Sequence, residues 1–236
     1  NGNGSNDVAL LVGHDTYDLL DDCLTLIGAA VDTQIVIAQS VIFGEQADGN
    51  GYLWSYGNSV ASASFYGIAL AQTTESPIFG HRGKSAATTT NMAVGSGLTL
   101  ASGTALTDAG YKGVRVVATV GIRVTGALTV DLELRFGAAS GGPSSVYTGS
   151  IDFAATSSTM PGRDDAATHY GLYIGSRGGS GGAADNHLGR GSGHSAAVGN
   201  FAARRFASFD SGLVADVLSD ILARNGDFPT SFLEAA

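Results

Sequence analysis

The sequence predicts an all-β protein: an antiparallel two-sheet β-sandwich followed by one C-terminal amphipathic helix. Three observations lead to this prediction. Glycine makes up 35 of the 236 residues, about twice its ordinary share of roughly 7%. Charged residues make up only 14% and hydrophobic residues 44%, a composition typical of a chain with many turns, short strands and a real core. Period-two alternation dominates most of the chain and gives way to helical periodicity near its end.

The chain divides into three parts. Residues 1–7 (NGNGSND) are predicted to form a flexible linker or N-terminal extension, because they are all small or polar. Residues 8–209 are predicted to form the sandwich domain, and residues 210–236 the C-terminal helix and tail. Early in the domain, residues 14–28 fit a helical face and a strand equally well.

The strands are predicted from apolar or alternating runs that lie between turn-forming residues. They occupy residues 8–13, 33–44, 51–58, 65–72, 76–83, 91–94, 113–138, 146–155, 170–176 and 195–209. The pattern is clearest near the end of 113–138, where Val130, Leu132 and Leu134 alternate with Asp131 and Glu133. Such alternation directs one face of a strand into a core and the other toward water.

A helix is predicted for residues 211–224. Its apolar positions follow helical spacing: Leu213, Val214, Val217, Leu218, Ile221 and Leu222. Asp210 or Ser211 can cap the first turn, and Asn225-Gly226 suits a left-handed stop. Because only one face is apolar, either the sandwich or a neighbouring subunit must cover that face.

The composition argues against several functions. The net charge is −9, and Lys84 and Lys112 are the only lysines, so the chain is not expected to bind nucleic acid. No apolar run reaches 18 residues, so no membrane insertion is expected. The glycine-rich stretch 177–194 lacks the spacing of a nucleotide-binding loop and is predicted to connect two strands. Cys23, the only cysteine, is predicted to be a small core residue.

Three segments resemble the concanavalin-A-like jelly-roll domains of the laminin-G and pentraxin kind. GLYIGSRGGSGG (171–182) and AAVGNFAARRFASFDSGLVADVLSDIL (196–222) resemble the closing part of that family. There, a strand ending in Ile-Gly precedes a long loop, a returning strand and a short acidic helical turn. GNGYLWSYGNSVASASFYGIALA (49–71) resembles the family's paired strands. The family's strand of the form W-H-x-V is replaced by residues 113–119, which contain no Trp or His.

The resemblance implies a jelly-roll sandwich, often with a face that binds carbohydrate or calcium, and such modules recur in virus head and tail appendages. It leads us to expect a non-enzymatic module for adhesion or assembly on a virion or another extracellular structure. The expected partners are glycans and either further copies of the chain or other structural subunits. Two alternatives stay open: a jelly-roll glycoside hydrolase, and an architectural shell or fibre subunit that binds no small ligand.

Candidate ligand-binding residues are aromatic, amide and guanidinium side chains near turns, because sugars stack on rings and bond to polar groups. They are Trp54, Tyr56, Tyr66, Arg177, Asn186 and Arg190. Trp54 and Tyr56 share one strand face, and the alternative for that face is the core. Asp48 and Asn50, in the turn at 46–51, are candidate Ca²⁺ ligands. The alternative there is an ordinary turn, and no other cofactor is expected.

Asp131 and Glu133 place two carboxylates on one face of a strand. Jelly-roll glycosidases use such a pair as nucleophile and acid, in a motif that resembles E-x-D-x-x-E. Here the order is reversed and residue 136 is Phe, while Arg135 lies on the same face and can neutralise the pair. A solvated strand face is therefore favoured over a catalytic pair.

Overall fold

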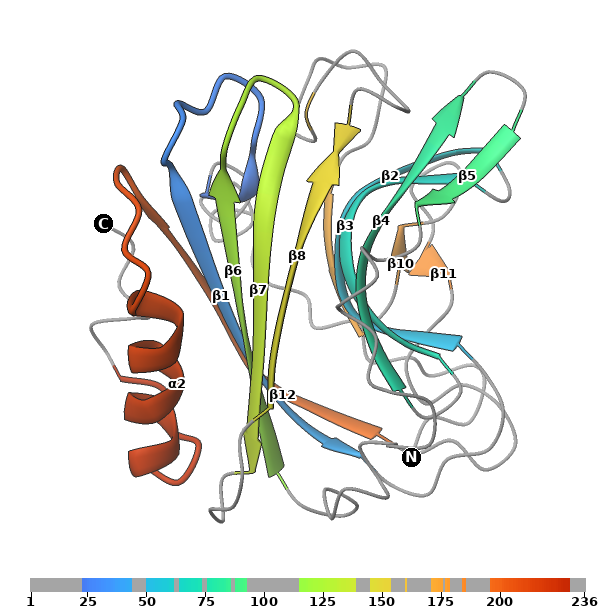
Figure 1. Cartoon of the computed structure of the whole chain (residues 1–236). Helices are drawn as coiled ribbons and strands as arrows, with labels where there is room; N and C mark the ends of the chain where they lie inside the picture. The colour runs from blue at the N-terminus through green and yellow to red at the C-terminus, as the bar shows by residue number, and fades with distance from the viewer. Residues whose placement is uncertain are drawn as a thin grey trace.

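The structure is a β-sandwich of two five-stranded antiparallel sheets with one helix packed on the outside (Figure 1). It is a computed structural model that describes residues 23–43, 50–61, 64–73, 76–85, 88–92, 115–138, 145–153, 160, 171–175, 177–178, 184–185 and 196–229. The predicted fold class, an all-β two-sheet sandwich with a C-terminal helix, is confirmed.

The first sheet has the strand order β12-β1-β6-β7-β8 and the second the order β5-β4-β3-β2-β9. The strands of the first sheet are β12 (Ala196–Phe206), β1 (Gln34–Phe43), β6 (Arg115–Val124), β7 (Thr129–Ala138) and β8 (Ser145–Asp152). Those of the second are β5 (Thr88–Met92), β4 (Ser76–Ser85), β3 (Ser64–Thr73), β2 (Asn50–Ala61) and β9 (Gly171–Ile174). Each of these strands falls on a segment predicted from alternation, within a few residues at its ends.

The core lies between the two sheets and takes the apolar residues of one strand parity, except that the adjacent Leu53 and Trp54 both enter it at a register shift in β2. On β7 these are Val130, Leu132, Leu134 and Phe136, each 2% exposed or less. The second sheet contributes Leu53, Trp54, Tyr56, Ile68 and Leu70 to the same cluster. One polar side chain also joins the sheets, because the buried Gln39 on β1 donates from Nε2 to the carbonyl oxygen of Leu53 at 3.0 Å. Burial of these side chains supplies the main driving force for joining the sheets.

Helix α2 (Leu213–Ala223) lies against the outer face of the first sheet (Figure 1). Val214, Leu218 and Ile221 are its buried residues, and they form a second apolar cluster with Val36, Ala38, Val117, Ala202 and Phe228. Glycines permit the close approach. A Cβ atom at Gly121 would stand 2.5 Å from Cγ2 of Val214, and one at Gly137 would stand 2.5 Å from Cδ1 of Leu222. The apolar stripe predicted for this helix is therefore covered by the chain's own sheet.

The ends of α2 follow the predicted signals with one change. The N-cap is Gly212, which has no side chain to offer, and the Asp210 carboxylate instead accepts the Gly212 N–H at 2.8 Å. At the other end Asn225 and Gly226 have φ angles of 55° and 88°. The N–H of Gly226 bonds to the carbonyl of Ile221 at 2.9 Å, and that of Asn225 to Leu222 at 3.0 Å. This pattern is a Schellman stop, as Asn-Gly suggested.

Two segments differ from their predicted form or lie outside the described residues. The glycine-rich stretch predicted as a plain loop contains a short antiparallel ribbon, β10 (Arg177–Gly178) and β11 (Ala184–Asp185). Two-residue strands carry too little alternation to be seen in a sequence. Of the ambiguous segment 14–28, only residues 23–28 are described, and Cys23 and Leu24 are helical. Within the described chain, no helix has the length and apolar character needed to cross a membrane.

Candidate functional site

Two rows of outward side chains run across the open part of the first sheet. Pairing between strands places Gln34, Arg123, Asp131 and Ser150 in one row across β1, β6, β7 and β8. In the next row Gly121, Glu133 and Thr148 lie side by side, and its β1 member, Val36, is buried beneath α2. Neighbouring strands are about 4.8 Å apart, so each row places groups of different chemistry side by side. No single strand could do this alone.

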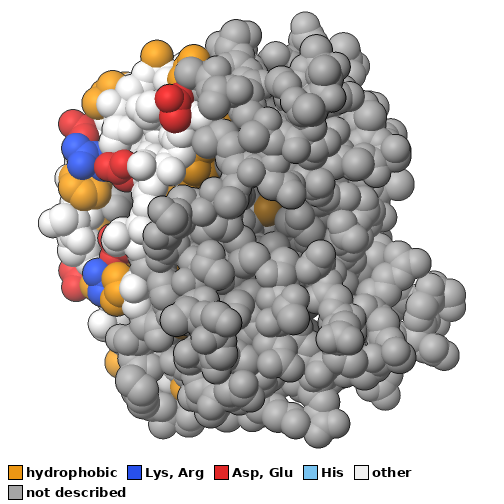
Figure 2. Space-filling view, turned by 45° about the vertical axis from the view of Figure 1, so that its right-hand side comes forward, with side chains coloured by type: hydrophobic (Ala, Val, Ile, Leu, Met, Phe, Trp, Pro, Cys, Tyr) orange, Lys and Arg blue, Asp and Glu red, His pale blue; other side chains and the backbone are white. Residues whose placement is uncertain are grey.

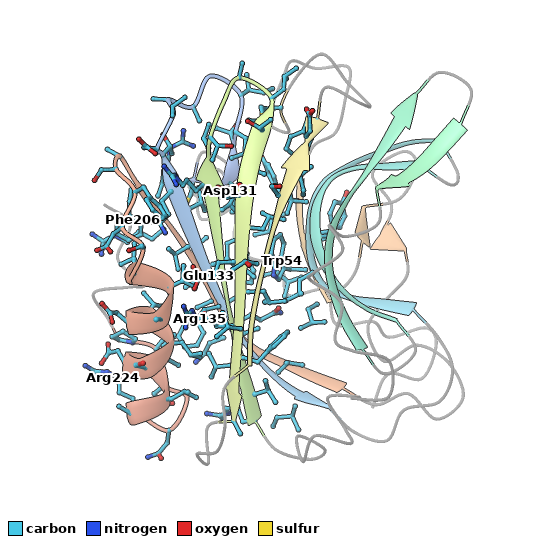
Figure 3. All side chains as sticks on the ribbon, viewed as in Figure 1. Trp54, Asp131, Glu133, Arg135, Phe206 and Arg224 are labelled. Carbon is cyan, nitrogen blue, oxygen red and sulfur yellow. The ribbon has the colours of Figure 1, made fainter. Side chains whose placement is uncertain are left out.

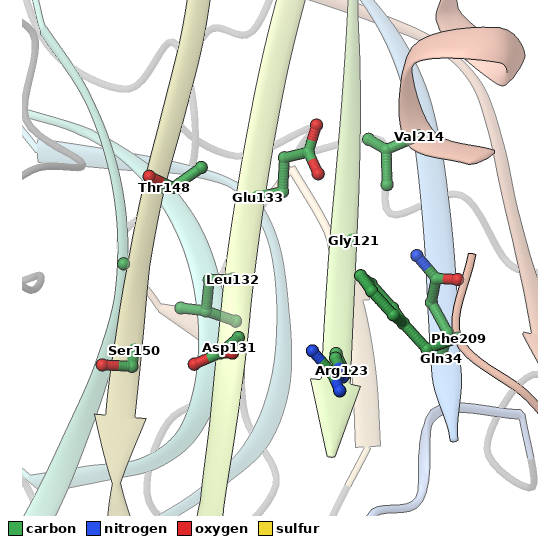
Figure 4. A pocket seen from close by; sticks show the side chains of 11 residues that line it. Gln34, Gly121, Arg123, Asp131, Leu132, Glu133, Thr148, Ser150, Phe209 and Val214 are labelled. Carbon is green, nitrogen blue, oxygen red and sulfur yellow. The ribbon is translucent and has the colours of Figure 1, made fainter. Parts of the chain in front are cut away.

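These rows form the floor of a groove with a volume of about 350 Å³ (Figure 4). Phe209 and Val214, from the start of the helical segment, form one wall. The full lining is Gln34, Gly121, Arg123, Asp131, Leu132, Glu133, Thr148, Gly149, Ser150, Phe209 and Val214. The lining thus combines carboxylates, a guanidinium, hydroxyls, an amide and one aromatic ring.

Arg123 is held in place from two sides. Its Nε and Nη2 atoms both donate to Oδ1 of Asp32, at 3.0 and 2.6 Å. Its guanidinium carbon lies 4.0 Å from the centre of the Phe209 ring, a cation–π contact. Asp32 has a φ angle of 68°, a left-handed conformation that Asp and Asn tolerate better than most residues. The turn before β1 therefore positions the carboxylate that orients Arg123.

The two carboxylates of the groove have different surroundings. Glu133 is paired with Arg135, whose Nε donates to its Oε1, and its side chain is only 20% exposed. The Asp131 side chain is exposed and makes no hydrogen bond or ion pair within the described part of the chain. Arg123 is its direct neighbour on β6, but Asp32 engages the guanidinium instead. Asp131 is therefore the carboxylate that is open to a ligand.

The wall of the groove is anchored to its floor by a pair of hydrogen bonds. The side chain of Gln34 donates from Nε2 to the carbonyl of Asp210 at 3.1 Å. The backbone N–H of Asp210 donates in return to Oε1 of Gln34 at 2.9 Å. This pairing fixes the segment between β12 and α2 and, with it, the adjacent ring of Phe209, which stays 38% exposed.

The structure corrects the aromatic candidates of the sequence analysis. Trp54 and Tyr56 are 1% and 2% exposed and belong to the core between the sheets. Figure 3 shows Trp54 between the two sheets. Their shared strand face is the inner one, so neither ring is available as a surface platform. Sequence alternation places both rings on one face of β2, but it does not show whether that face is the inner or the outer one.

The other candidates are not brought together in the described part of the chain. Tyr66 lies on β3 and Arg177 on β10, and the positions of their side chains are not described. Asn186 and Arg190 lie outside the described residues, as does Asp48, while Asn50 begins β2. Among described residues, no group of three His, Cys, Asp or Glu side chains is placed to hold a metal ion. A Ca²⁺ site at Asp48 and Asn50 therefore stays a prediction.

Sequence reasoning singled out Asp131 and Glu133 but missed most of the groove. The missed polar residues are Gln34, Arg123, Thr148 and Ser150, and the missed ring is Phe209. Strand parity could have placed each polar residue on an outward face. Only the register between strands shows that those faces adjoin.

Two groups outside the groove have raised pKa values. Burial raises the pKa of the Cys23 thiol to about 11, although the charge of Arg205 acts in the opposite direction. Burial also raises the pKa of Tyr173. A thiol with a raised pKa is a poor nucleophile near neutral pH, which suits a packing role for Cys23 beside the core.

The described part of the surface carries charges of both signs. In Figure 2 acidic, basic and apolar side chains stand close together on this face rather than in one extended patch of one kind. Two of the exposed pairs are Arg224 with Asp220 at 3.1 Å and Arg115 with Asp227 at 3.8 Å. Exposed pairs of this kind contribute little to stability.

Similarity to known proteins is found among solved structures. No protein-family model matches the chain, and no curated protein matches it. Among solved structures, the chain is similar to the marine PL-14 alginate lyase from Aplysia kurodai, with 13% sequence identity and a TM-score of 0.41 over 75% of this chain and 71% of that chain.

This finding corrects one expectation and leaves others as predictions. The expectation that the protein is not an enzyme is contradicted, because a solved structure to which the chain is similar is that of an enzyme. At 13% identity and a TM-score of 0.41, this similarity assigns no activity to the chain. Neither the laminin-G and pentraxin resemblance nor a virion origin is shown, and both stay predictions.

Proposed function

We propose that this protein is carbohydrate-active and binds a saccharide in the outer-face groove. One observation carries the proposal: polar side chains from four neighbouring strands meet the exposed ring of Phe209 in a single groove. Three separate segments of the chain are needed to build this arrangement.

The chemistry of the lining suits a polyhydroxylated ligand. Carboxylates accept hydrogen bonds from sugar hydroxyls, Arg123 donates them, and the Ser150 and Thr148 hydroxyls do both. The Phe209 ring offers an apolar face to the C–H groups of a sugar, and the Arg123 guanidinium is already ordered against that ring at 4.0 Å. Because Asp32 and Gln34 hold the wall and the floor in place before a ligand arrives, little ordering remains to oppose binding.

A panel of soluble oligosaccharides tests the proposal. The panel should hold several backbones, each in neutral, amino-bearing and uronate forms, with affinity measured by calorimetry. We expect binding by at least one member, and we expect Phe209→Ala to weaken it at least about tenfold, as loss of a central aromatic contact does at other interfaces. Asp220→Asn is the control, since Asp220 lies on α2 and pairs with Arg224. Equal affinity of Phe209→Ala and the parent protein would show that the groove is not the saccharide-binding site.

A second function, cleavage of a glycosidic bond, is favoured by the positions of Asp131 and Glu133. Both line the groove, and two residues of strand separate them by about 6.8 Å along β7. This is the separation of their backbone positions, and carboxyl groups about 6.5–9.5 Å apart suit inverting cleavage, in which one acts as acid and the other activates a water molecule. Figure 3 shows both side chains on the same face of β7 as Arg135.

Release of reducing ends from the saccharides that bind is the measurement for cleavage. Asp131→Asn and Glu133→Gln should each lower the rate by roughly 100-fold or more, the usual contribution of a general acid or base. Glu133→Gln should still bind, because the amide keeps the shape of the carboxylate. A rate that stays unchanged in both variants, or that is lost equally in Asp220→Asn, would reject cleavage by this pair.

A further inference from the structure

One carboxylate of the groove has no oppositely charged partner among the described residues. The groove's one arginine, Arg123, is engaged by Asp32, and the nearby Arg135 is engaged by Glu133. Each guanidinium thus already faces a carboxylate of the protein. Asp131 is left exposed, with no partner among the described residues.

Further carboxylates stand around the groove. Asp210 and Asp216 lie at the start of α2, within 3.5 and 3.6 Å of where a Cβ atom of Gly212 would stand. Asp152 is exposed on β8, two residues beyond Ser150 and of the same strand parity. Of these, Asp210 already accepts a hydrogen bond from the Gly212 N–H, and Asp152 also has an interaction of its own. Among the described residues named here, carboxylates thus outnumber guanidinium groups, in line with the net charge of −9 of the whole chain.

We propose that the groove selects saccharides that carry a protonated amino group, prefers them to neutral saccharides, and discriminates against uronates. This inference rests on the proposed function and assigns the class of ligand for the same site. The ammonium group would lie against Asp131, with the Ser150 hydroxyl as its neighbour on β8. A uronate carboxylate placed there would meet a like charge, and the nearest guanidinium is already committed to Asp32.

Asp32 is the positioning residue in this scheme. Arg123 and Asp131 are directly paired across β6 and β7, so the guanidinium could neutralise Asp131 if nothing held it elsewhere. Two hydrogen bonds to Asp32, at 3.0 and 2.6 Å, keep the Arg123 guanidinium at Asp32 instead. Removing the charge of Asp32 should therefore release Arg123 toward Asp131 and abolish the preference for an amine without touching the ligand.

Matched trisaccharides provide the test. Trimers of glucose, glucosamine and glucuronate share one β-1,4 backbone and differ in charge, and the same triplet is taken from whichever backbone of the panel binds. At about pH 6, where aspartates are ionised, and at low ionic strength, we expect the amino form to bind about fivefold tighter than the neutral form. The uronate should bind about fivefold weaker, as for unit charges about 4 Å apart in water. In about 1 M salt the differences should shrink, since the Debye length falls to about 3 Å.

Three variants sharpen the test. Asp131→Asn and Asp32→Asn should each reduce the amine preference to less than about twofold, whereas Asp220→Asn, which removes an equal charge from the far side of α2, should keep it. The amide that Asp32→Asn introduces keeps the tolerance for a left-handed backbone, so the loss would not reflect misfolding. A melting temperature measured for each variant checks that point.

The outcomes separate the two proposals. If saccharides bind in the groove but the uronate equals the neutral form, or the amine has no advantage, this inference is wrong and the proposed function stands. If the amine preference survives Asp131→Asn, the charge lies elsewhere and the inference is also wrong. If no member of any charge class binds, both fail together.

Discussion

Helix α2 covers one part of the outer face of the first sheet and leaves another part open (Figure 1). We call these the covered half and the open half, and they differ in the burial and the polarity of their side chains. Beneath the helix, Val36, Ala38 and Val117 are buried and apolar. Beyond its first turn, β6 carries Arg123 and the neighbouring β7 carries Asp131. Along β6 the outward residues pass from Val117 to Thr119, Gly121 and Arg123 within a single strand. Whether α2 covers a position, more than the strand to which it belongs, therefore determines whether the side chain there is apolar or polar.

The largest effect is expected in the covered half. Leu218→Ala should lower the free energy of unfolding by about 2–5 kcal/mol, because the 4% exposed side chain would leave a cavity between α2 and the sheet. Melting temperatures at two well-separated protein concentrations should fall equally, since the helix packs on its own chain. Ser219→Ala on the exposed face is the matched control. A loss that grew on dilution would place the helix against another subunit instead.

The boundary between the halves can be tested with two glycines. Gly121→Ala should cost about 1–3 kcal/mol, because its new methyl group would strike the stiff, buried Val214. Gly137→Ala should cost less, because it meets the end of Leu222, a side chain that can change rotamer. Chemical denaturation of the pair gives the ordering, and a reversed ordering would show that α2 sits differently over β6 and β7.

In the open half, Asp32→Asn should lower stability by only about 0.5 kcal/mol. The Asp32 and Arg123 side chains are 50% and 34% exposed, and water and salt weaken such a pair. The small loss should vanish in high salt. Denaturation curves at low and high salt measure it, and a loss of several kcal/mol would mean that the pair also supports the fold.

The smallest effect is expected at the outer edge of the groove. Ser150→Ala should change stability by no more than about 0.5 kcal/mol in either direction, since the residue is exposed on β8. It should still weaken saccharide binding, because a hydroxyl of the groove floor is lost. Thr148→Val serves as a second probe of the same strand. A stable variant with unaltered binding would exclude β8 from the site.

Much of the fold could be predicted because alternation and helical periodicity are local. The restart of alternation after Gly126 marks β6 and β7 as separate strands, and the apolar spacing from Leu213 to Leu222 marks α2. The docking place of α2 was left open between the sandwich and a neighbouring subunit. The helix can pack on the sheet because two glycines, Gly121 and Gly137, lie beneath it. Their alignment under the helix depends on strand pairing.

The site was predicted less well, for a related reason. Strand parity says which residues share a face but not which face is inside, so Trp54 and Tyr56 were named as ligand residues and are core residues. Asp131 and Glu133 were noticed because they lie on one strand. Gln34, Arg123 and Ser150 reach the same row only through pairing across four strands. The extracellular or virion location and the oligomeric partners stay predictions.

The Gln34–Asp210 pairing has a consequence for how the protein is made. Translation delivers the residues of β1, β6, β7 and β8 before residues 196–229. Only when residues 196–229 emerge can β12 pair with β1, Asp210 bond to Gln34, and Phe209 close over Arg123. The wall of the groove is therefore the last part of it to be synthesised. A message with a stop codon ahead of Phe209 would yield a polypeptide that keeps Asp131 and Glu133 but lacks the ring of Phe209, and we expect it to lose the proposed saccharide binding.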